Sequence, residues 1–269
     1  MPARVLYPRP AMELSAAIRD ANNANRLGLL VYTIPGFPSA ATYRATLSWL
    51  EAQDNVSIIE TTIPVTTGFS DHANETIRAA HSAAARESDD AMTFLRMKKP
   101  SLCVLYQSTA SATSFDDVCR RCSGIFDGMI LEWSEPNETP YVKTADAHGI
   151  ELVQCIGPWM DQARMRAILD NARQGGLVYL MSAEMTGAKL FSRDELCRCI
   201  EQAKTYRPDV VMAAGFGVRT EDDVRFLATV PGLDAAIVGT EFLRKAALGE
   251  ATTRAYVESL GRALARPTS

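Results

Sequence analysis

GLLVYTIPGFP, residues 28–38, reads as a buried strand followed by a turn that holds two prolines and one glycine. A chain of alternating strands and helices can form an open doubly wound sheet or a closed barrel. The open sheet would normally carry a glycine-rich dinucleotide fingerprint after its first strand. The turn at 34–38 lacks this fingerprint, and the stretch therefore favours the closed barrel.

Outward from this stretch, short β-branched or apolar runs recur with amphipathic stretches between them, which is typical of repeated βα units and a parallel sheet. The runs predict strands at Gly28–Thr33, Val56–Glu60, Leu102–Tyr106, Gly128–Glu132, Glu151–Cys155, Leu177–Leu180, Val210–Ala214 and Ala235–Val238. Eight parallel strands are the number found in the (β/α)8 TIM barrel, the α/β fold that we predict.

Apolar residues at spacings of three and four predict the outer ring of helices. These helices are Ala40–Glu51, Glu75–Ala85, Phe115–Cys122, Thr144–His148, Met160–Ala172, Arg193–Tyr206, Glu221–Thr229 and Phe242–Leu248. The fourth has the weakest pattern, because two prolines and an Asn-Glu pair lie just before it at 134–141. An extra N-terminal helix at Met12–Ala24 is expected to cover the bottom of the barrel, and a last helix is expected at Thr252–Ala265.

Length and composition agree with one globular unit. The 269 residues, 47% hydrophobic and 22% charged, suit a single TIM-barrel domain over 1–269. The formal net charge is −4, no basic cluster is present, and no run reaches the roughly 18 apolar residues that span a bilayer. We therefore expect no nucleic-acid or membrane partner, and a cytoplasmic location because no signal-peptide pattern opens the chain.

Two cysteine pairs resemble metal or redox motifs, Cys119 with Cys122 and Cys197 with Cys199. Both pairs lie in segments with helical periodicity, and neither has a histidine nearby. The three histidines share no ligand spacing. We therefore expect no metal site.

The chemistry of such a barrel lies in the loops after its strands, where eight strand ends and several helix N-termini meet. The second strand ends in Glu60, and a second carboxylate, Asp71, follows in the next loop. Two carboxylates at one opening could divide acid and base roles, since different burial separates their pKa values. The alternative for Glu60 is an ordinary salt bridge at a strand exit.

Glycine-containing turns follow the last three strands, at Thr186-Gly187, Gly215-Phe216-Gly217 and Gly239-Thr240. Glycine lets backbone N–H groups approach an anion closely, and barrels commonly bind phosphate in the loops after strands seven and eight. These turns therefore predict a phosphate site. The alternative is that the glycines serve only as turn and packing residues.

Several segments resemble one known family. Glu60-Thr61-Thr62-Ile63-Pro64 resembles the Glu-Leu-Gly-Ile-Pro that ends the second strand in the tryptophan synthase alpha subunit family, and Asp71 follows at the spacing of that family's second catalytic acid. The first-strand exit at 32–38, the flexible sixth-strand loop at 178–187 and the phosphate-binding turns at 215–218 and 237–240 resemble family segments in the same order. The likeness spans nearly the whole chain.

This resemblance implies a retro-aldol cleavage of indole-3-glycerol phosphate to indole and glyceraldehyde 3-phosphate, without a metal or organic cofactor. It implies that Glu60 protonates indole C3 and removes the proton of the glycerol hydroxyl, and that Asp71 holds the indole N–H. It also implies that Tyr106, Tyr179 and Thr186 bind the substrate and that Gly187, Gly217, Gly239 and Thr240 bind its phosphate. For Tyr106, a half-buried barrel aromatic without this role is the alternative.

The sequence departs from the family between the two acids, where Val65–Ala73 keeps only the second acid of the family's loop. Trp133 stands at the family's aspartate position after strand four, and the sixth-strand loop is one residue shorter. Three hypotheses remain open. The protein is a free-standing lyase, an alpha subunit that pairs with a beta-like subunit, or a phosphate-binding barrel that acts as a regulatory module or on another phosphorylated substrate.

Overall fold

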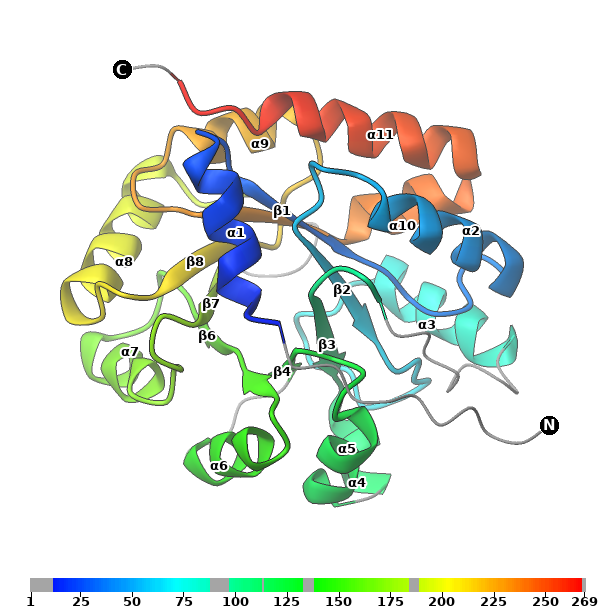
Figure 1. The fold of residues 1–269 in the computed structure, drawn as a ribbon, viewed down its shortest axis with the longest axis horizontal. Helices are drawn as coiled ribbons and strands as arrows, with labels where there is room; N and C mark the ends of the chain where they lie inside the picture. The colour runs from blue at the N-terminus through cyan, green and yellow to red at the C-terminus, as the bar shows by residue number, and fades with distance from the viewer. Residues whose placement is uncertain (1–11, 88–96, 113, 133–137, 184–188, 268–269) are drawn as a thin grey trace.

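A parallel sheet forms the centre of the molecule in the computed structural model, which describes residues 12–87, 97–112, 114–132, 138–183 and 189–267 (Figure 1). Its strands are β1 (Gly28–Tyr32), β2 (Ile58–Thr62), β3 (Ser101–Leu105), β4 (Gly128–Leu131), β5 (Glu151–Leu152), β6 (Gln154–Ile156), β7 (Leu177–Met181), β8 (Val211–Gly215) and β9 (Ala235–Val238). They are ordered β5-β4-β3-β2-β1-β9-β8-β7-β6, and every pairing is parallel.

The sheet closes through its fifth predicted strand, which is divided in two at Val153. The first half, β5, pairs with β4, and the second half, β6, pairs with β7. Val153 itself donates a backbone hydrogen bond of 2.8 Å to the carbonyl oxygen of Met129. Because one extended segment joins both ends of the sheet, the nine strand segments make an eight-stranded barrel, and the predicted fold is confirmed.

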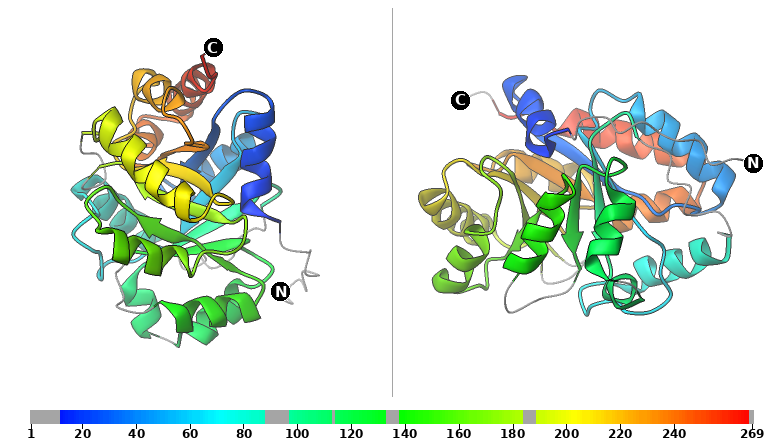
Figure 2. Two further views of the ribbon diagram at one scale, coloured as in Figure 1. Left: turned by 90° about the vertical axis from the view of Figure 1, so that its left-hand side faces the viewer. Right: turned by 60° about the horizontal axis from the view of Figure 1, so that its bottom comes forward.

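Helices surround this barrel on its outer side, as both views of Figure 2 show. They are α1 (Leu14–Asn23), α2 (Ala40–Glu51), α3 (Glu75–Glu87), α4 (Gln107–Ala112), α5 (Phe115–Cys122), α6 (Thr139–Ala147), α7 (Gln162–Leu169), α8 (Arg193–Tyr206), α9 (Glu221–Ala228), α10 (Thr240–Ala247) and α11 (Glu250–Ala263). None of these helices combines the length and the apolar character that crossing a membrane requires.

Two details of the helix prediction were wrong. Helix α6 begins at Thr139 rather than at 144, because Pro140 lies in the first turn, where a missing N–H removes no helical hydrogen bond. Helix α4 was not predicted at all. Its sequence, QSTASA, is a single polar and small stretch without an apolar period.

Helix α1 covers the N-terminal end of the barrel, as predicted. The glycines that begin β1 and β4 make room for it: a Cβ at Gly28 would lie 3.2 Å from Ile18, and one at Gly128 would lie 2.5 Å from Leu14. Both α1 side chains are fully buried. This end of the barrel is therefore filled by apolar packing, and the opposite end remains for chemistry.

The sheet register brings the first candidate residues together at that opposite end. Tyr32, the last residue of β1, pairs with Glu60 in β2, and Glu60 in turn pairs with Leu102 in β3. Residues that pair in a parallel sheet point to the same face. Tyr32 and Glu60 therefore both face the barrel interior near its C-terminal rim.

Candidate active site

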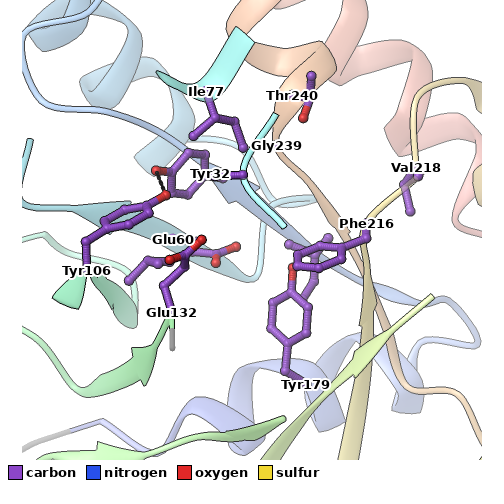
Figure 3. Close-up of a pocket in the computed structure, with 14 residues that line it drawn as sticks. Tyr32, Glu60, Ile77, Tyr106, Glu132, Tyr179, Phe216, Val218, Gly239 and Thr240 are labelled. Carbon is purple, nitrogen blue, oxygen red and sulfur yellow. Dashed lines mark hydrogen bonds between the residues drawn. The ribbon is translucent and has the colours of Figure 1, made fainter. Parts of the chain in front are cut away.

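A cavity opens at the C-terminal end of the strands and is lined by residues that lie in, or just after, seven of them (Figure 3). Six residues singled out from the sequence line it: Glu60, Tyr106, Tyr179, Gly217, Gly239 and Thr240. Tyr32, Ile77, Glu132, Phe216 and Val218 line it as well and were not predicted as site residues. A second, larger cavity adjoins it, and the two share Glu60, Val104, Glu132, Tyr179 and Phe216.

Glu60 lies at the junction of the two cavities and is only 4% exposed. Its backbone carbonyl is held by the N–H and the hydroxyl of Thr33, at 2.8 and 3.1 Å. Its side-chain Oε2 is buried and has no hydrogen-bond partner. Burial without a compensating cation raises the pKa of Glu60 to about 8, because desolvation disfavours the charged form. The carboxyl group is therefore mostly protonated at neutral pH and can act as an acid.

Asp71 is exposed on the β2–α3 loop and lines the larger cavity together with Glu60. The residue before it anchors this loop. Ser70 donates its N–H to Glu132 Oε2 at 2.9 Å and its hydroxyl to Glu132 Oε1 at 2.5 Å. Arg78 donates to the Ser70 carbonyl at 2.8 Å. Burial raises the pKa of Glu132, although the Ser70 hydrogen bonds oppose the rise.

A second anchor of the loop involves Gly68 and α4. Gly68 has φ +78°, and a Cβ there would lie 2.6 Å from Ser108, so only glycine fits. The Ser108 hydroxyl donates to the Thr67 carbonyl at 2.7 Å. Helix α4 therefore supports the loop that carries Asp71.

A buried histidine lies next to Tyr32 and Tyr106, two of the tyrosines that line the cavity. His81 of α3 is fully buried, and its Nε2 lies 2.9 Å from the Tyr32 hydroxyl. The Tyr32 hydroxyl lies 3.3 Å from that of Tyr106. Burial lowers the pKa of His81 to about 3. The imidazole is therefore neutral, and it is a hydrogen-bonding group rather than a charge.

The opposite side of the cavity is built from the turns after β8 and β9. Gly239 is the N-cap residue of α10, and it has no side chain that could bond the first N–H groups of this helix. Asn74 donates to the Thr240 hydroxyl oxygen at 3.1 Å, which leaves the hydroxyl proton for another acceptor. Phe216 has φ +71°, unusual for an aromatic residue, and the Ser182 hydroxyl bonds its carbonyl at 2.8 Å.

The structure thus brings Glu60, Asp71, Tyr106 and Tyr179 to the two adjoining cavities, with Gly217, Gly239 and Thr240 on one wall. Thr186 and Gly187 lie outside the described residues. The same rule that singled out Glu60, inspection of strand ends, applies to Glu132 just after β4. Tyr32 and His81 gave no separate signal. Among the described residues, no group of three His, Cys, Asp or Glu side chains could hold a metal ion.

Fold and site together define a class: a (β/α)8-barrel enzyme in which a buried neutral carboxyl and a loop carboxylate face cavities with a helix N-terminus on one wall. Comparison with known proteins identifies the family. The sequence profile of the tryptophan synthase alpha chain matches residues 18–264. The chain belongs to the tryptophan synthase alpha chain family.

Relatives and solved structures agree with this assignment. The chain is 29% identical to the tryptophan synthase alpha chain of Caulobacter vibrioides over 238 residues, 80% of each chain. It is 27% identical to that of Methanosarcina mazei over 252 residues, 90% of this chain and 88% of the relative. A chain of Mycobacterium tuberculosis tryptophan synthase has the same fold, with a TM-score of 0.81 at 20% identity over 96% of this chain and all of that chain. Family membership supports a lyase that cleaves indole-3-glycerol phosphate.

Proposed function

We propose that this protein is a carbon–carbon lyase that cleaves indole-3-glycerol phosphate to indole and glyceraldehyde 3-phosphate, with Glu60 as the acid and Asp71 as its partner. The observation that carries the assignment of Glu60 is its buried, unpartnered carboxyl oxygen in a cavity with a pKa of about 8. A carboxyl group in this state holds a proton at neutral pH and can transfer it to a substrate.

The substrate lies across the two cavities. Its phosphate binds at Gly217, Gly239 and Thr240, where backbone N–H groups, the α10 N-terminus and the Thr240 hydroxyl favour an anion. Its indole ring extends into the larger cavity, which is lined by apolar residues such as Val104 and Ile130. Glu60, common to both cavities, then lies beside the bond that joins the two halves.

The reaction needs two proton transfers at Glu60. The neutral carboxyl first gives its proton to indole C3, which leaves Glu60 as a carboxylate and the ring as a cation. The carboxylate then takes the proton of the adjacent hydroxyl group, the carbon–carbon bond breaks, and its electron pair returns to the ring while the oxygen becomes an aldehyde. Asp71 accepts a hydrogen bond from the indole N–H and stabilises the positive charge on the ring. Glu60 ends protonated, as it began.

Indole release from purified protein tests this function. Wild-type protein should form indole from indole-3-glycerol phosphate, and Glu60→Gln and Asp71→Asn should each lower kcat by roughly 100-fold or more, the size of a general acid–base contribution. Glu258→Gln is a matched control, because Glu258 is exposed on α11, a helix that lines neither cavity. Absence of turnover by the wild-type protein would reject the proposal, and a fully active Glu60→Gln variant would reject the role of Glu60.

We further propose that the chain reaches its catalytic state without a beta subunit. The resemblance to the family implies that the β2–α3 loop faces such a subunit, whereas here Glu132, Arg78 and Ser108 hold this loop from within the chain. Sedimentation and indole formation with and without the beta chain of the same organism test this. A stable complex whose turnover exceeds that of the chain alone by tenfold or more would contradict it.

A further inference from the structure

A chain of hydrogen bonds runs from the β2–α3 loop to the cavity through three buried side chains. The N–H of Val65 in the loop donates to His81 Nδ1 at 3.1 Å. His81 Nε2 lies 2.9 Å from the Tyr32 hydroxyl. The Tyr32 hydroxyl lies 3.3 Å from the Tyr106 hydroxyl (Figure 3). Val65 and His81 come from the loop and α3, and the tyrosines come from the ends of β1 and β3.

The first of these hydrogen bonds sets the direction of the others. A backbone N–H can only donate, so His81 Nδ1 must be the acceptor and cannot carry a proton. The neutral ring then carries its proton on Nε2 and donates it to the Tyr32 oxygen. Tyr32 has one proton of its own, which can bond the Tyr106 oxygen. Tyr106 is left with its proton free to point into the cavity.

Aromatic packing keeps this arrangement in place. The Phe69 ring of the loop lies edge-on to both His81 and Tyr106, with centroids 5.2 and 5.1 Å apart, and His81 lies edge-on to Tyr106 at 4.7 Å. His81 is completely buried, and Tyr32 and Tyr106 are 5% and 3% exposed. Water therefore has little access to this series of hydrogen bonds, and the donor and the acceptor of each bond stay the same.

We propose that His81, acting through Tyr32, is a positioning residue that holds the Tyr106 hydroxyl as a hydrogen-bond donor toward the oxygen of the substrate that becomes the aldehyde. The proposal rests on the lyase function above. When Glu60 removes the proton of the substrate hydroxyl, negative charge develops on that oxygen. A donor fixed in advance stabilises this charge without reorganisation.

Tyr106 gives no proton away in this step. Burial raises the pKa of its phenol, so the group stays protonated and acts only as a donor. The proton of the substrate hydroxyl goes to Glu60, as in the reaction above, and the proton count is unchanged. The β2–α3 loop takes part in the same series of hydrogen bonds, because the Val65 N–H that sets the His81 tautomer belongs to the segment that carries Asp71.

A double-mutant cycle with indole-3-glycerol phosphate tests the proposal. Tyr106→Phe should lower kcat by roughly tenfold or more, and Tyr32→Phe by roughly fivefold, with KM changed less than twofold, as expected for hydrogen bonds that matter mainly in the transition state. In the Tyr106→Phe background, Tyr32→Phe should change kcat less than about twofold, because its effect passes through Tyr106.

Tyr256→Phe is the matched control. It also removes one hydroxyl group from a buried tyrosine, here one that lines neither cavity and donates to the Arg219 carbonyl at 3.0 Å. We expect it to lower the midpoint of urea unfolding and to leave kcat unchanged. Equal kcat losses for Tyr256→Phe and Tyr32→Phe, or full additivity of Tyr32→Phe with Tyr106→Phe, would overturn the proposal.

Nitrogen NMR of the ¹⁵N-histidine-labelled protein gives a readout that does not depend on turnover. The His81 signal, assigned by its loss in His81→Phe, should show a protonated Nε2 and an unprotonated Nδ1. A ring protonated on Nδ1 would overturn the proposal even if the enzyme is active. An active wild-type enzyme with unchanged kcat in Tyr32→Phe overturns the positioning role alone, whereas a wild-type protein without turnover overturns both this role and the proposed function.

Discussion

Replacing Glu60 by glutamine should make the protein more stable than the wild type at alkaline pH, while it removes the proposed activity. Glutamine has nearly the shape of a protonated glutamic acid, but it cannot ionise. The wild-type carboxyl is buried, and its Oε2 has no hydrogen-bond partner that would stabilise a charge. Ionisation of Glu60 is therefore costly in the folded protein and costs nothing in the unfolded chain.

The size of the effect follows from the two pKa values. The folded pKa of about 8 lies above the value of 4.5 for an unperturbed glutamate, so the folded state holds the Glu60 proton more tightly than the unfolded state does. The contribution of this group to stability is complete below the unfolded pKa and is lost as the pH rises through the folded pKa. One pKa unit corresponds to about 1.4 kcal/mol in the free energy of unfolding. The whole shift therefore corresponds to a loss of roughly 5 kcal/mol of stability at high pH.

Urea unfolding of wild-type and Glu60→Gln protein from about pH 5 to about pH 9 measures this difference. The free energy of unfolding of the variant minus that of the wild type should rise by several kcal/mol across the range. Glu258→Gln, which changes an exposed glutamate, should show no such rise. A difference for Glu60→Gln that stays constant within about 0.5 kcal/mol would refute the reasoning, because Glu60 would then ionise as easily in the folded protein as in the unfolded chain.

Three further changes probe other parts of the site. Gly215→Ala should lower the free energy of unfolding by about 1–3 kcal/mol in urea titrations, because the new methyl group would meet the Tyr179 ring and hydroxyl. Ser70→Ala removes the hydroxyl bond to Glu132 and should raise KM several-fold with a stability change of about 1 kcal/mol, and an unchanged KM would contradict a role of this anchor. Thr240→Val should weaken inhibition by inorganic phosphate roughly tenfold, measured as the inhibition constant in the indole assay.

The sequence predicted the fold well because periodicity reports which residues face the core. Parallel strands buried on both sides are short apolar runs, and all eight runs lie in the barrel. The division of the fifth strand at Val153 has no such signal, because its two halves differ only in their pairing partner. Helix α4 was missed for the opposite reason: it is short and polar, and it owes its place to contacts with the β2–α3 loop, such as Ser108 with Thr67.

The candidate site was predictable only where one residue carries the signal. In the sequence, Glu60 is recognisable as an acid at a strand end, and the glycines are recognisable as turn residues. The hydrogen bond between Ser70 and Glu132 joins residues 62 positions apart, and that between His81 and Tyr32 spans 49 positions. No local pattern reveals such a pair, because each residue alone fits a polar surface or a helix. The roles of Glu60, Asp71 and the phosphate-binding residues stay predictions until the variants are measured.

The two ends of the barrel differ in the physical character of their residues. At the end covered by α1, Gly28 and Gly128 meet apolar side chains, an arrangement that serves only stability. At the other end, Glu60 leaves a buried oxygen unpaired, which costs about 1–3 kcal/mol, and Phe216 has a positive φ, which costs a similar amount. The unfavourable features of Glu60 and Phe216 both lie at the opening that we propose for catalysis. A ligand that donates to the free Glu60 oxygen would remove one of these costs, and part of its binding energy would therefore appear as increased stability of the folded protein.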